Sequence, residues 1–177
     1  MVGELKVERR AVQGSGFDEL RLTTSSPLPL EALCDAIWAK NLSNAKPEGA
    51  FKKRVLIRES ETERVTYEQI GVPVVSDRDY VMQVSLVQPS SSGRCEVAFK
   101  TCQDPAFPPA PHFVRIAEIR GDWLLTPAQD GRTTISYVIF SDPGGGVPAF
   151  FARGGQRDAA ISFMKTILAR AGGTPPP

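Results

Sequence analysis

The residues able to carry out chemistry are few in this sequence of 177 residues, and they form no recognisable reactive set. His112 is the only histidine, so a metal site built from several histidines is excluded, and a histidine-based triad would depend on this residue alone. Cys34, Cys95 and Cys102 are an odd number of cysteines, at spacings that match neither a zinc site nor a disulfide framework. We therefore expect reduced thiols that serve as small core residues, and no metal or cofactor.

Two further motifs have structural explanations that we favour over chemical ones. The run Gly144, Gly145 and Gly146 lacks the Lys-Ser/Thr of a phosphate-binding loop and the GxGxxG spacing, so it is better interpreted as a hinge before a helix. Arg78 stands between Asp77 and Asp79, and such a cluster more often fixes a loop that enters a strand than contacts a ligand headgroup.

The three tyrosines are the stronger candidates for contact with a ligand. Tyr67, Tyr80 and Tyr137 each lie in a segment with the composition of a strand. A buried phenol needs a hydrogen-bond partner, and a ligand in an otherwise apolar cavity can provide one. Trp123 is predicted to pack in the core rather than to touch a ligand.

The charge and hydropathy of the chain exclude some classes of partner. The formal net charge is +1, which gives no electrostatic footprint for nucleic acid, and 41% of the residues are hydrophobic. No apolar run approaches the length of about 20 residues that spans a bilayer. The sequence as given predicts a cytoplasmic protein, or a periplasmic or exported one if a leader was removed.

The elements that must position these residues are mostly strands. Strand patterns cover residues 5–12, 18–25, 51–59, 63–72, 80–88, 94–103, 112–127 and 133–140. Tyr80, Met82, Val84 and Leu86 alternate onto one face of their strand. The segment 112–127 is the longest strand candidate, with a bend or bulge at Gly121.

Two helices and one irregular segment complete the pattern. A helix begins near Pro29 and presents Leu30, Leu33, Ile37 and Trp38 on its apolar face. Residues 104–111 hold four prolines and are not a regular element. A long C-terminal helix carries one broad apolar stripe formed by Ala160, Ile161, Phe163, Met164, Ile167 and Leu168.

The order of elements predicts an α+β fold, in which a curved antiparallel sheet of about seven to nine strands packs against the C-terminal helix. Side chains could fill the space between sheet and helix. The aromatic and methionine residues on inward faces, together with the glycine-rich entrance to the helix, favour a cavity there instead.

Three segments then resemble a known family, the START domain family of lipid-transfer domains in the helix-grip (Bet v 1-like) superfamily. They are VSDRDYV at 75–81, RGDWLLTP at 120–127 and YVIFSDPGGGVP at 137–148. The resemblance runs from about residue 5 to residue 171 and implies one START-like domain over residues 1–177, with an ordered core at about 4–171 and a flexible tail at 172–177.

The resemblance implies a hydrophobic tunnel between the sheet and the long helix, holding one lipid. Residues expected to line it are Tyr67, Tyr80, Met82, Val84, Phe99, Val114, Ile116, Tyr137, Ile139, Phe163, Met164 and Ile167. The gate implied by the family is formed by the helix and the loops that face it, which here are 72–77, 104–111 and 142–148. Its expected gate or hinge residues are Val74, Pro108, Gly144, Gly145 and Gly146. The family's charged pair inside the tunnel has no counterpart that the sequence alone identifies.

The function expected is the binding of a lipid or similar hydrophobic molecule, with transfer or presentation of it. This is a non-enzymatic function for a monomer that contacts membranes transiently. The alternative is an enzyme of the same superfamily, such as a polyketide aromatase/cyclase. That alternative needs a convergent acid/base set, which one histidine and scattered carboxylates do not supply.

Overall fold

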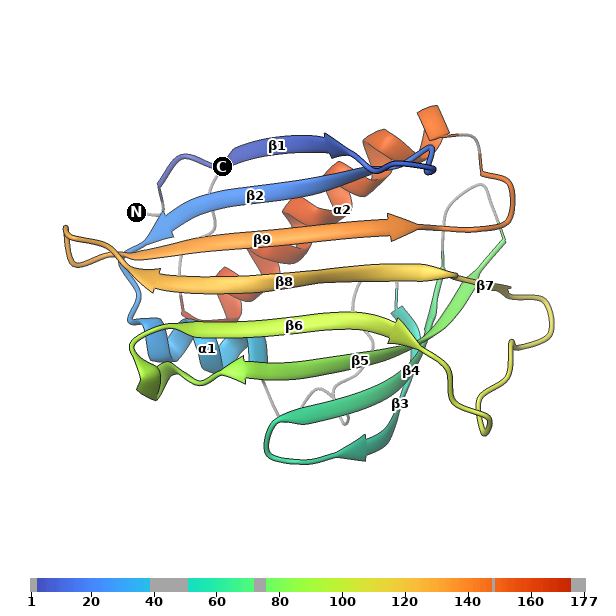
Figure 1. The fold of residues 1–177 in the computed structure, drawn as a ribbon, viewed down its shortest axis with the longest axis horizontal. Helices are drawn as coiled ribbons and strands as arrows, with labels where there is room; N and C mark the ends of the chain where they lie inside the picture. Colours follow the sequence, from blue (N-terminus) through green and yellow to red (C-terminus); the bar gives the residue numbers. More distant parts are fainter. Residues whose placement is uncertain (1–2, 39–50, 72–75, 148, 173–177) are drawn as a thin grey trace.

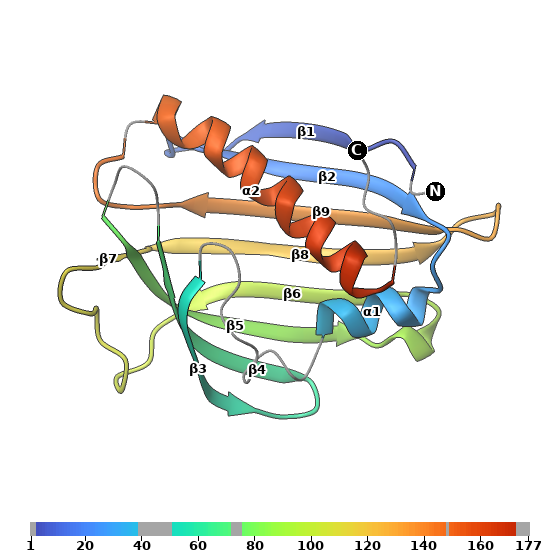
Figure 2. The ribbon, with the colours of Figure 1, turned by 180° about the vertical axis from the view of Figure 1, so that it is seen from behind.

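A computed structural model describes residues 3–38, 51–71, 76–147 and 149–172, and it has one large sheet with two helices on one face (Figures 1 and 2). The strands in sheet order are β1 (Lys6–Ala11), β2 (Asp18–Ser26), β9 (Thr133–Asp142), β8 (Glu118–Pro127), β6 (Cys95–Cys102), β5 (Arg78–Gln88), β4 (Glu63–Ile70) and β3 (Phe51–Glu59). All of these neighbours pair antiparallel. The expected α+β architecture is confirmed.

The helices α1 (Leu30–Trp38) and α2 (Ala149–Arg170) lie on the same side of the sheet, and α2 crosses several strands diagonally (Figure 2). The core between these layers contains Leu33 and Ile37 of α1, Met164 and Leu168 of α2, and Leu22 of β2. These residues fall at helical or alternating spacing in their elements, so each element buries one face. In the residues that the structure describes, no helix combines the length and the apolar character that crossing a bilayer would require.

The strand expected over residues 112–127 is divided into β7 (Val114–Arg115) and β8. The two residues of β7 pair in parallel with the start of β5, where Val114 N donates to the Asp77 carbonyl and Ile116 N to the Asp79 carbonyl. Strand β8 instead pairs with β6 and β9. The prediction of one continuous strand was therefore wrong, because the segment serves two different neighbours.

Gly121 is neither a bend nor a bulge. It stays in register with Phe99 on one side and with Ile139 on the other. A Cβ atom at this position would lie 2.0 Å from the Val138 carbonyl oxygen and 2.6 Å from the Phe99 ring. Glycine is required here because the neighbouring backbone and a large side chain occupy the space of a side chain.

The cysteine prediction is also corrected. Cys34 of α1 and Cys95 of β6 form a disulfide with a Cα–Cα distance of 6.0 Å, across a sequence separation of 61 residues. Cys102 is the free thiol. The disulfide connects α1 to the middle of the sheet, so the helix is held over the same face that α2 covers.

Candidate functional site

A cavity of about 510 Å³ lies between the sheet and α2. Strands β2, β4, β5, β6, β8 and β9 form one wall through residues that include Leu20, Ile70, Met82, Val97, Phe99, Ile119, Trp123 and Ile139. Helix α2 forms the other wall through Gln156, Ala159, Ala160, Ser162, Phe163, Thr166, Ile167 and Arg170. The lining is largely apolar. The volume of the cavity falls within the range of about 300–1,000 Å³ typical of small-molecule sites.

Three polar residues of the cavity wall form a row across three neighbouring strands of the sheet. Arg54, Glu68 and Tyr80 are direct partners in the register of β3, β4 and β5. Arg54 Nε donates to Glu68 Oε1 at 2.8 Å, and the Tyr80 hydroxyl donates to Glu68 Oε2 at 2.6 Å. The Thr66 hydroxyl adds a bond to Glu68 Oε1 at 3.1 Å. This Arg54–Glu68–Tyr80 row is therefore an ion pair whose carboxylate is also hydrogen-bonded on both oxygens.

Two residues of the row, Glu68 and Tyr80, are buried, and burial affects the protonation of Tyr80. Glu68 and Tyr80 are 7% and 5% exposed, and Arg54 lies between Glu68 and the ring of Phe51, with its Cζ 4.6 Å from the ring centroid. Burial raises the pKa of Tyr80 well above its usual value of 10.0, and the neighbouring Glu68 carboxylate raises it further. Tyr80 is therefore a neutral donor to a carboxylate at physiological pH.

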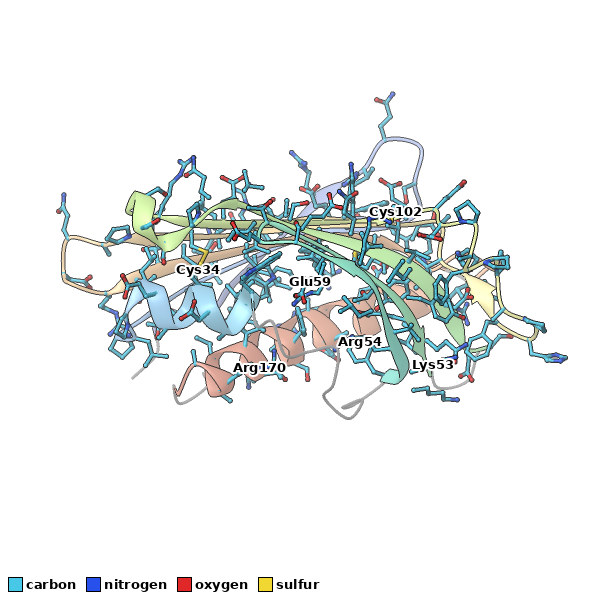
Figure 3. The ribbon with its side chains drawn as sticks, turned by 90° about the horizontal axis from the view of Figure 1, so that it is seen from below. Cys34, Lys53, Arg54, Glu59, Cys102 and Arg170 are labelled. Carbon is cyan, nitrogen blue, oxygen red and sulfur yellow. A yellow bond between two sulfur atoms is a disulfide. The ribbon has the colours of Figure 1, made fainter. Side chains whose placement is uncertain are left out.

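Arg64 adds a second cation to the same wall. Its guanidinium lies over the Trp38 ring, with Cζ 5.1 Å from the centroid, and Nη1 is 3.8 Å from Glu59 Oε1. Burial lowers the pKa of Arg64, while Glu59 opposes that shift. Arginines stay charged at neutral pH, and Arg54 and Arg64 each have a carboxylate close by. Figure 3 shows Arg54, Glu59 and the Arg170 end of α2 on the same side of the sheet.

Aromatic rings cover the opposite part of the sheet wall. The Trp123 and Tyr137 rings stack at a centroid distance of 4.0 Å with 12° between their planes. Phe163 of α2 meets both rings at 6.0 Å, and Phe99 lies 6.0 Å from Tyr137. Trp123, expected only in the core, thus also lines the cavity. Burial raises the pKa of Tyr137 far above its usual value.

Eight of the residues expected to line a tunnel are in the cavity wall, and four are elsewhere. The eight are Tyr80, Met82, Val84, Phe99, Tyr137, Ile139, Phe163 and Ile167. Met164 is fully buried in the core between the helices and the sheet. Ile116 packs against the wall residues Tyr80, Met82 and Ile119 without lining the cavity itself, and Val114 lies beside Gly145. Whether the eight contact a ligand stays a prediction.

Tyr67 points to the opposite face of the sheet. Its ring stacks on Phe107 at 5.0 Å, and its hydroxyl donates to Asp79 Oδ2 at 3.0 Å. The expectation failed because the inward residues of β4 are Thr66, Glu68 and Ile70, so that Tyr67 alternates outward. Burial, opposed by the bond from Gln69, raises the pKa of Tyr67.

The proline-rich segment 104–111 lies on that outer face too. Asp79 accepts from Ala110 N at 2.9 Å, and Arg115 Nη2 donates to the Phe107 carbonyl at 3.0 Å. Burial alone would raise the pKa of Asp79, but the bonds from Arg115, Ala110 and Tyr67 hold it below its usual value of 3.8. None of residues 104–111 is in the cavity wall, so the structure does not bring the expected gate residue Pro108 to the cavity.

The glycine run between β9 and α2 has the backbone that only glycine adopts readily. Gly144, Gly145 and Gly146 have φ of 64°, 66° and 66°. A Cβ atom on Gly145 would lie 3.0 Å from a Val114 methyl group and 3.5 Å from the Arg78 guanidinium. The glycine run therefore packs against β7 and against the start of β5. Val74, the remaining expected gate residue, lies outside the described residues.

Sequence reasoning missed the Arg54–Glu68 pair. The alternation of β4 does place Glu68 beside Thr66 and Ile70, which is the available signal. The alternation does not predict that Arg54 of β3 is its partner, because a register shift between Leu56 and Arg58 changes which residue lies opposite Glu68.

Comparison with protein families finds a match to the START domain, over residues 10–173. An uncharacterized protein of Pseudomonas aeruginosa, PA1579, is 26% identical over 169 residues, which are 94% of this chain and 82% of that protein.

Solved structures share the fold. Human STARD10 superposes with a TM-score of 0.78 at 18% identity, over 94% of this chain and 69% of that one. A fragment of the STAR-related lipid transfer protein of Xanthomonas axonopodis also gives 0.78, at 21% identity, over 94% and 93% of the two chains. The Zhui aromatase/cyclase of a Streptomyces species gives 0.58 at 14% identity, over 87% and 93%. At these identities the likeness shows the fold alone.

Proposed function

The chain belongs to the START domain family, and from this and the cavity we propose that it binds one lipid or similar hydrophobic molecule between the sheet and α2 and transfers or presents it. The observation that carries the proposal is the largely apolar cavity of about 510 Å³ between the sheet and α2. A relative named as a lipid transfer protein has the same fold.

The energetics of the cavity favour a hydrophobic ligand. Each methylene group moved from water into such a site contributes about 0.8 kcal/mol, so ten of them offset much of the entropic cost of capture. The Arg54–Glu68–Tyr80 row would then meet the polar end of the ligand. Arg54 uses Nε for Glu68, and its remaining N–H groups can donate to a ligand oxygen.

The segment between β9 and α2 is our candidate for the gate. Gly144, Gly145 and Gly146 give the backbone freedom at the point where the chain enters the helix that covers the cavity. Ligand entry through this side would need the start of α2 to move while the sheet remains in place.

The alternative is an enzyme of the aromatase/cyclase kind, since such an enzyme shares the fold. A catalytic base in the cavity would need a free oxygen or nitrogen to take a proton. Both oxygens of Glu68 accept bonds from protein donors, and Tyr80 donates to it. That arrangement supports binding over catalysis.

Native mass spectrometry of the protein purified from cells, followed by solvent extraction, tests the proposal. We expect a hydrophobic molecule at a ratio of about one to one, or its uptake from mixed liposomes. The variant Ile139→Trp fills the cavity and should abolish uptake. The variant Val138→Trp places the same side chain on the other face and should not. An apo mass with no uptake by the parent protein would overturn the proposal.

A further inference from the structure

Four residues from four neighbouring strands form a middle row across the sheet wall of the cavity. The row runs, in register, through Val84, Phe99, Gly121 and Ile139. Its three side chains line the cavity and pack against both hydrophobic clusters of the inner face, the one that contains Met82 and the one that contains Trp123. The middle row is therefore the boundary between two halves of the cavity wall.

Gly121 determines where the Phe99 ring lies. A Cβ atom on Gly121 would be 2.6 Å from Phe99 Cζ, so the tip of the ring occupies the space of a side chain on β8. The ring thus leans across β8, and its centroid is 6.0 Å from that of Tyr137 on β9. A side chain at position 121 would push the ring away from the sheet and toward α2. Glycine at this position therefore leaves depth in the cavity above the middle row.

Helix α2 carries small residues where it passes over the middle row. Gln156 Nε2 donates to the Ser141 carbonyl of β9 at 2.6 Å, and the Phe163 ring lies 6.0 Å from the Tyr137 ring. Ile139 lies between Ser141 and Tyr137 on the inner face of β9, so α2 passes it between Gln156 and Phe163. The helix residues of the cavity wall within that interval are Ala159, Ala160 and Ser162. Both walls are therefore low at the same place.

The charged residues of the cavity wall surround the middle row on several sides. They are Asp18, Arg54, Arg64, Glu68 and Arg170. Arg64 pairs with Val84 at the edge of the row, but its guanidinium lies over the Trp38 ring. An apolar group placed across the four residues of the row leaves water without removing a charge from it. Hydrocarbon is therefore what the middle of the cavity fits.

A ligand that contacts both halves of the wall has to be extended. Along β5, the distance from Tyr80 to Leu86, the register partner of Val97, is about 20 Å at roughly 3.3 Å per residue. Tyr80 and Val97 both line the cavity. A compact molecule would contact one half only, whereas a chain that crosses the middle row buries methylene groups against both.

We propose, on the basis of the proposed function above, that the ligand carries an extended, unbranched hydrocarbon chain that crosses the middle row between Phe99 and the small residues of α2. Phe99 is then a residue that determines specificity. Its ring, lying on Gly121, leaves depth for a straight chain and occupies the depth that methyl branches would need.

Fatty acids of increasing length test the crossing on the full chain. Octanoate, laurate and palmitate share one head group, and their affinities are measured by quenching of tryptophan fluorescence, with native mass spectrometry for stoichiometry. The affinity of the parent protein should rise with length, by up to about fourfold for each methylene group buried. Ala159→Leu narrows the passage from the helix side, so we expect palmitate to bind at least about tenfold more weakly and octanoate about equally. Ala169→Leu, at an exposed position of α2 outside the cavity wall, is the matched control.

A second pair of probes tests Phe99 itself. Phytanate is the methyl-branched counterpart of palmitate, and the parent protein should prefer palmitate by about tenfold or more. Phe99→Leu removes the ring and deepens the wall, so this preference should fall to about threefold or less. Phe107→Leu makes the same change on the opposite face of the sheet, where the ring stacks on Tyr67, and should leave the preference unchanged. Urea unfolding of each variant shows that it is folded under the conditions of the assay.

The outcomes separate this inference from the proposed function. Equal weakening of all three acids by Ala159→Leu, or weakening of none, would overturn the chain that crosses the middle row. An unchanged preference for palmitate in Phe99→Leu would overturn the role of Phe99. Extraction of a compact molecule without a hydrocarbon chain from the purified protein would overturn the inference while binding itself stands. If no acid binds to the parent protein and no hydrophobic molecule is extracted from it, the proposed function fails as well.

Discussion

The guanidinium of Arg78 donates through Nε to the carbonyl oxygen of Pro143 at 3.4 Å, and through Nη1 to the carbonyl oxygen of Ser76. A single side chain, 2% exposed, thus connects the segment that enters β5 with the segment that leaves β9 toward α2. The sequence suggested that Arg78 fixes a loop through the neighbouring aspartates. The structure shows that it fixes two segments, and through backbone carbonyls.

The first prediction concerns Arg78 as a restraint on the proposed gate. Arg78→Lys keeps the charge but loses the forked donor geometry, so at least one of the two carbonyl contacts is lost. We expect the free energy of unfolding to fall by about 1–3 kcal/mol, measured in urea, and ligand exchange from vesicles to become faster. Arg94→Lys, at an exposed position, is the control. Reduced stability with an unchanged exchange rate would leave Arg78 a structural residue only.

Gly145 supplies the second prediction. Gly145→Ala places a Cβ atom at a φ of 66° and 3.0 Å from a Val114 methyl group. The left-handed backbone costs about 1–2 kcal/mol for a residue other than glycine, so thermal unfolding should occur at a lower temperature. Gly154→Ala, in α2 with no atom near its Cβ position, should have the opposite effect, stabilising by about 0.5–1 kcal/mol. Equal shifts in both variants would contradict the strained geometry.

The disulfide between Cys34 and Cys95 supplies the third. A disulfide that spans 61 residues lowers the conformational entropy of the unfolded chain. In the chain-entropy treatment this stabilises the folded protein by about 4 kcal/mol, and typical measured stabilisations are about 2–4 kcal/mol. Cys34→Ser should lower stability by that order, whereas Cys102→Ser should have little effect. Thiol titration of the denatured, unreduced protein should find one free thiol per chain. Three thiols would mean that the disulfide does not form in the compartment where the protein was made.

The sequence predicted the layers of this fold well and the details of the cavity in part. Alternation on β5 correctly placed Tyr80, Met82 and Val84 on the inner face, because the register of β5 shifts only beyond them, between Leu86 and Gln88. The disulfide was not predictable, since its two cysteines meet only when α1 packs over β6. The Arg54–Glu68 pair depends on a register shift in β3, which leaves no clear signal in the sequence.

The apolar stripe on α2 shows the same limit of prediction from the sequence. Phe163, Met164 and Ile167 belong to one apolar face by their spacing, yet the face meets both the packed core and the cavity. Met164 is fully buried in the core, while Phe163 lines the cavity and is 39% exposed. Periodicity identifies the stripe, and only the position of the helix over the sheet divides it.

The fourth prediction uses that division. Met164→Ala should lower the free energy of unfolding by about 2–5 kcal/mol, the cost of a large-to-small change in a packed core. Phe163→Ala should change stability much less but weaken ligand binding, because its ring contacts Trp123 and Tyr137 in the cavity wall. Urea unfolding and the binding assay on both variants decide the matter. A reversed pattern would show that the boundary between core and cavity is misplaced.

The fifth prediction concerns alkaline pH. Burial raises the pKa values of Tyr67, Tyr80 and Tyr137 above the usual 10.0, and Glu68 adds to the shift at Tyr80. Below pH 10.0 the tyrosines are protonated in both states, and the full stability is present. Above it the unfolded chain releases protons that the folded protein retains, so stability falls as pH rises.

Tyrosinate absorbance followed against pH should therefore show no ionisation near pH 10.0 in the folded protein, then one cooperative rise that coincides with loss of the circular dichroism signal of the sheet. Tyr80→Phe should shift this transition to higher pH. Urea unfolding of the variant at neutral pH is the control, because it shows whether the loss of the hydrogen bond to Glu68 alone unfolds the protein. Gradual ionisation of tyrosine at the usual pKa, with the sheet intact, would mean that water reaches the Arg54–Glu68–Tyr80 row freely. The cavity wall would then be open to solvent at its polar row, and a ligand would have to displace that water in order to bind there.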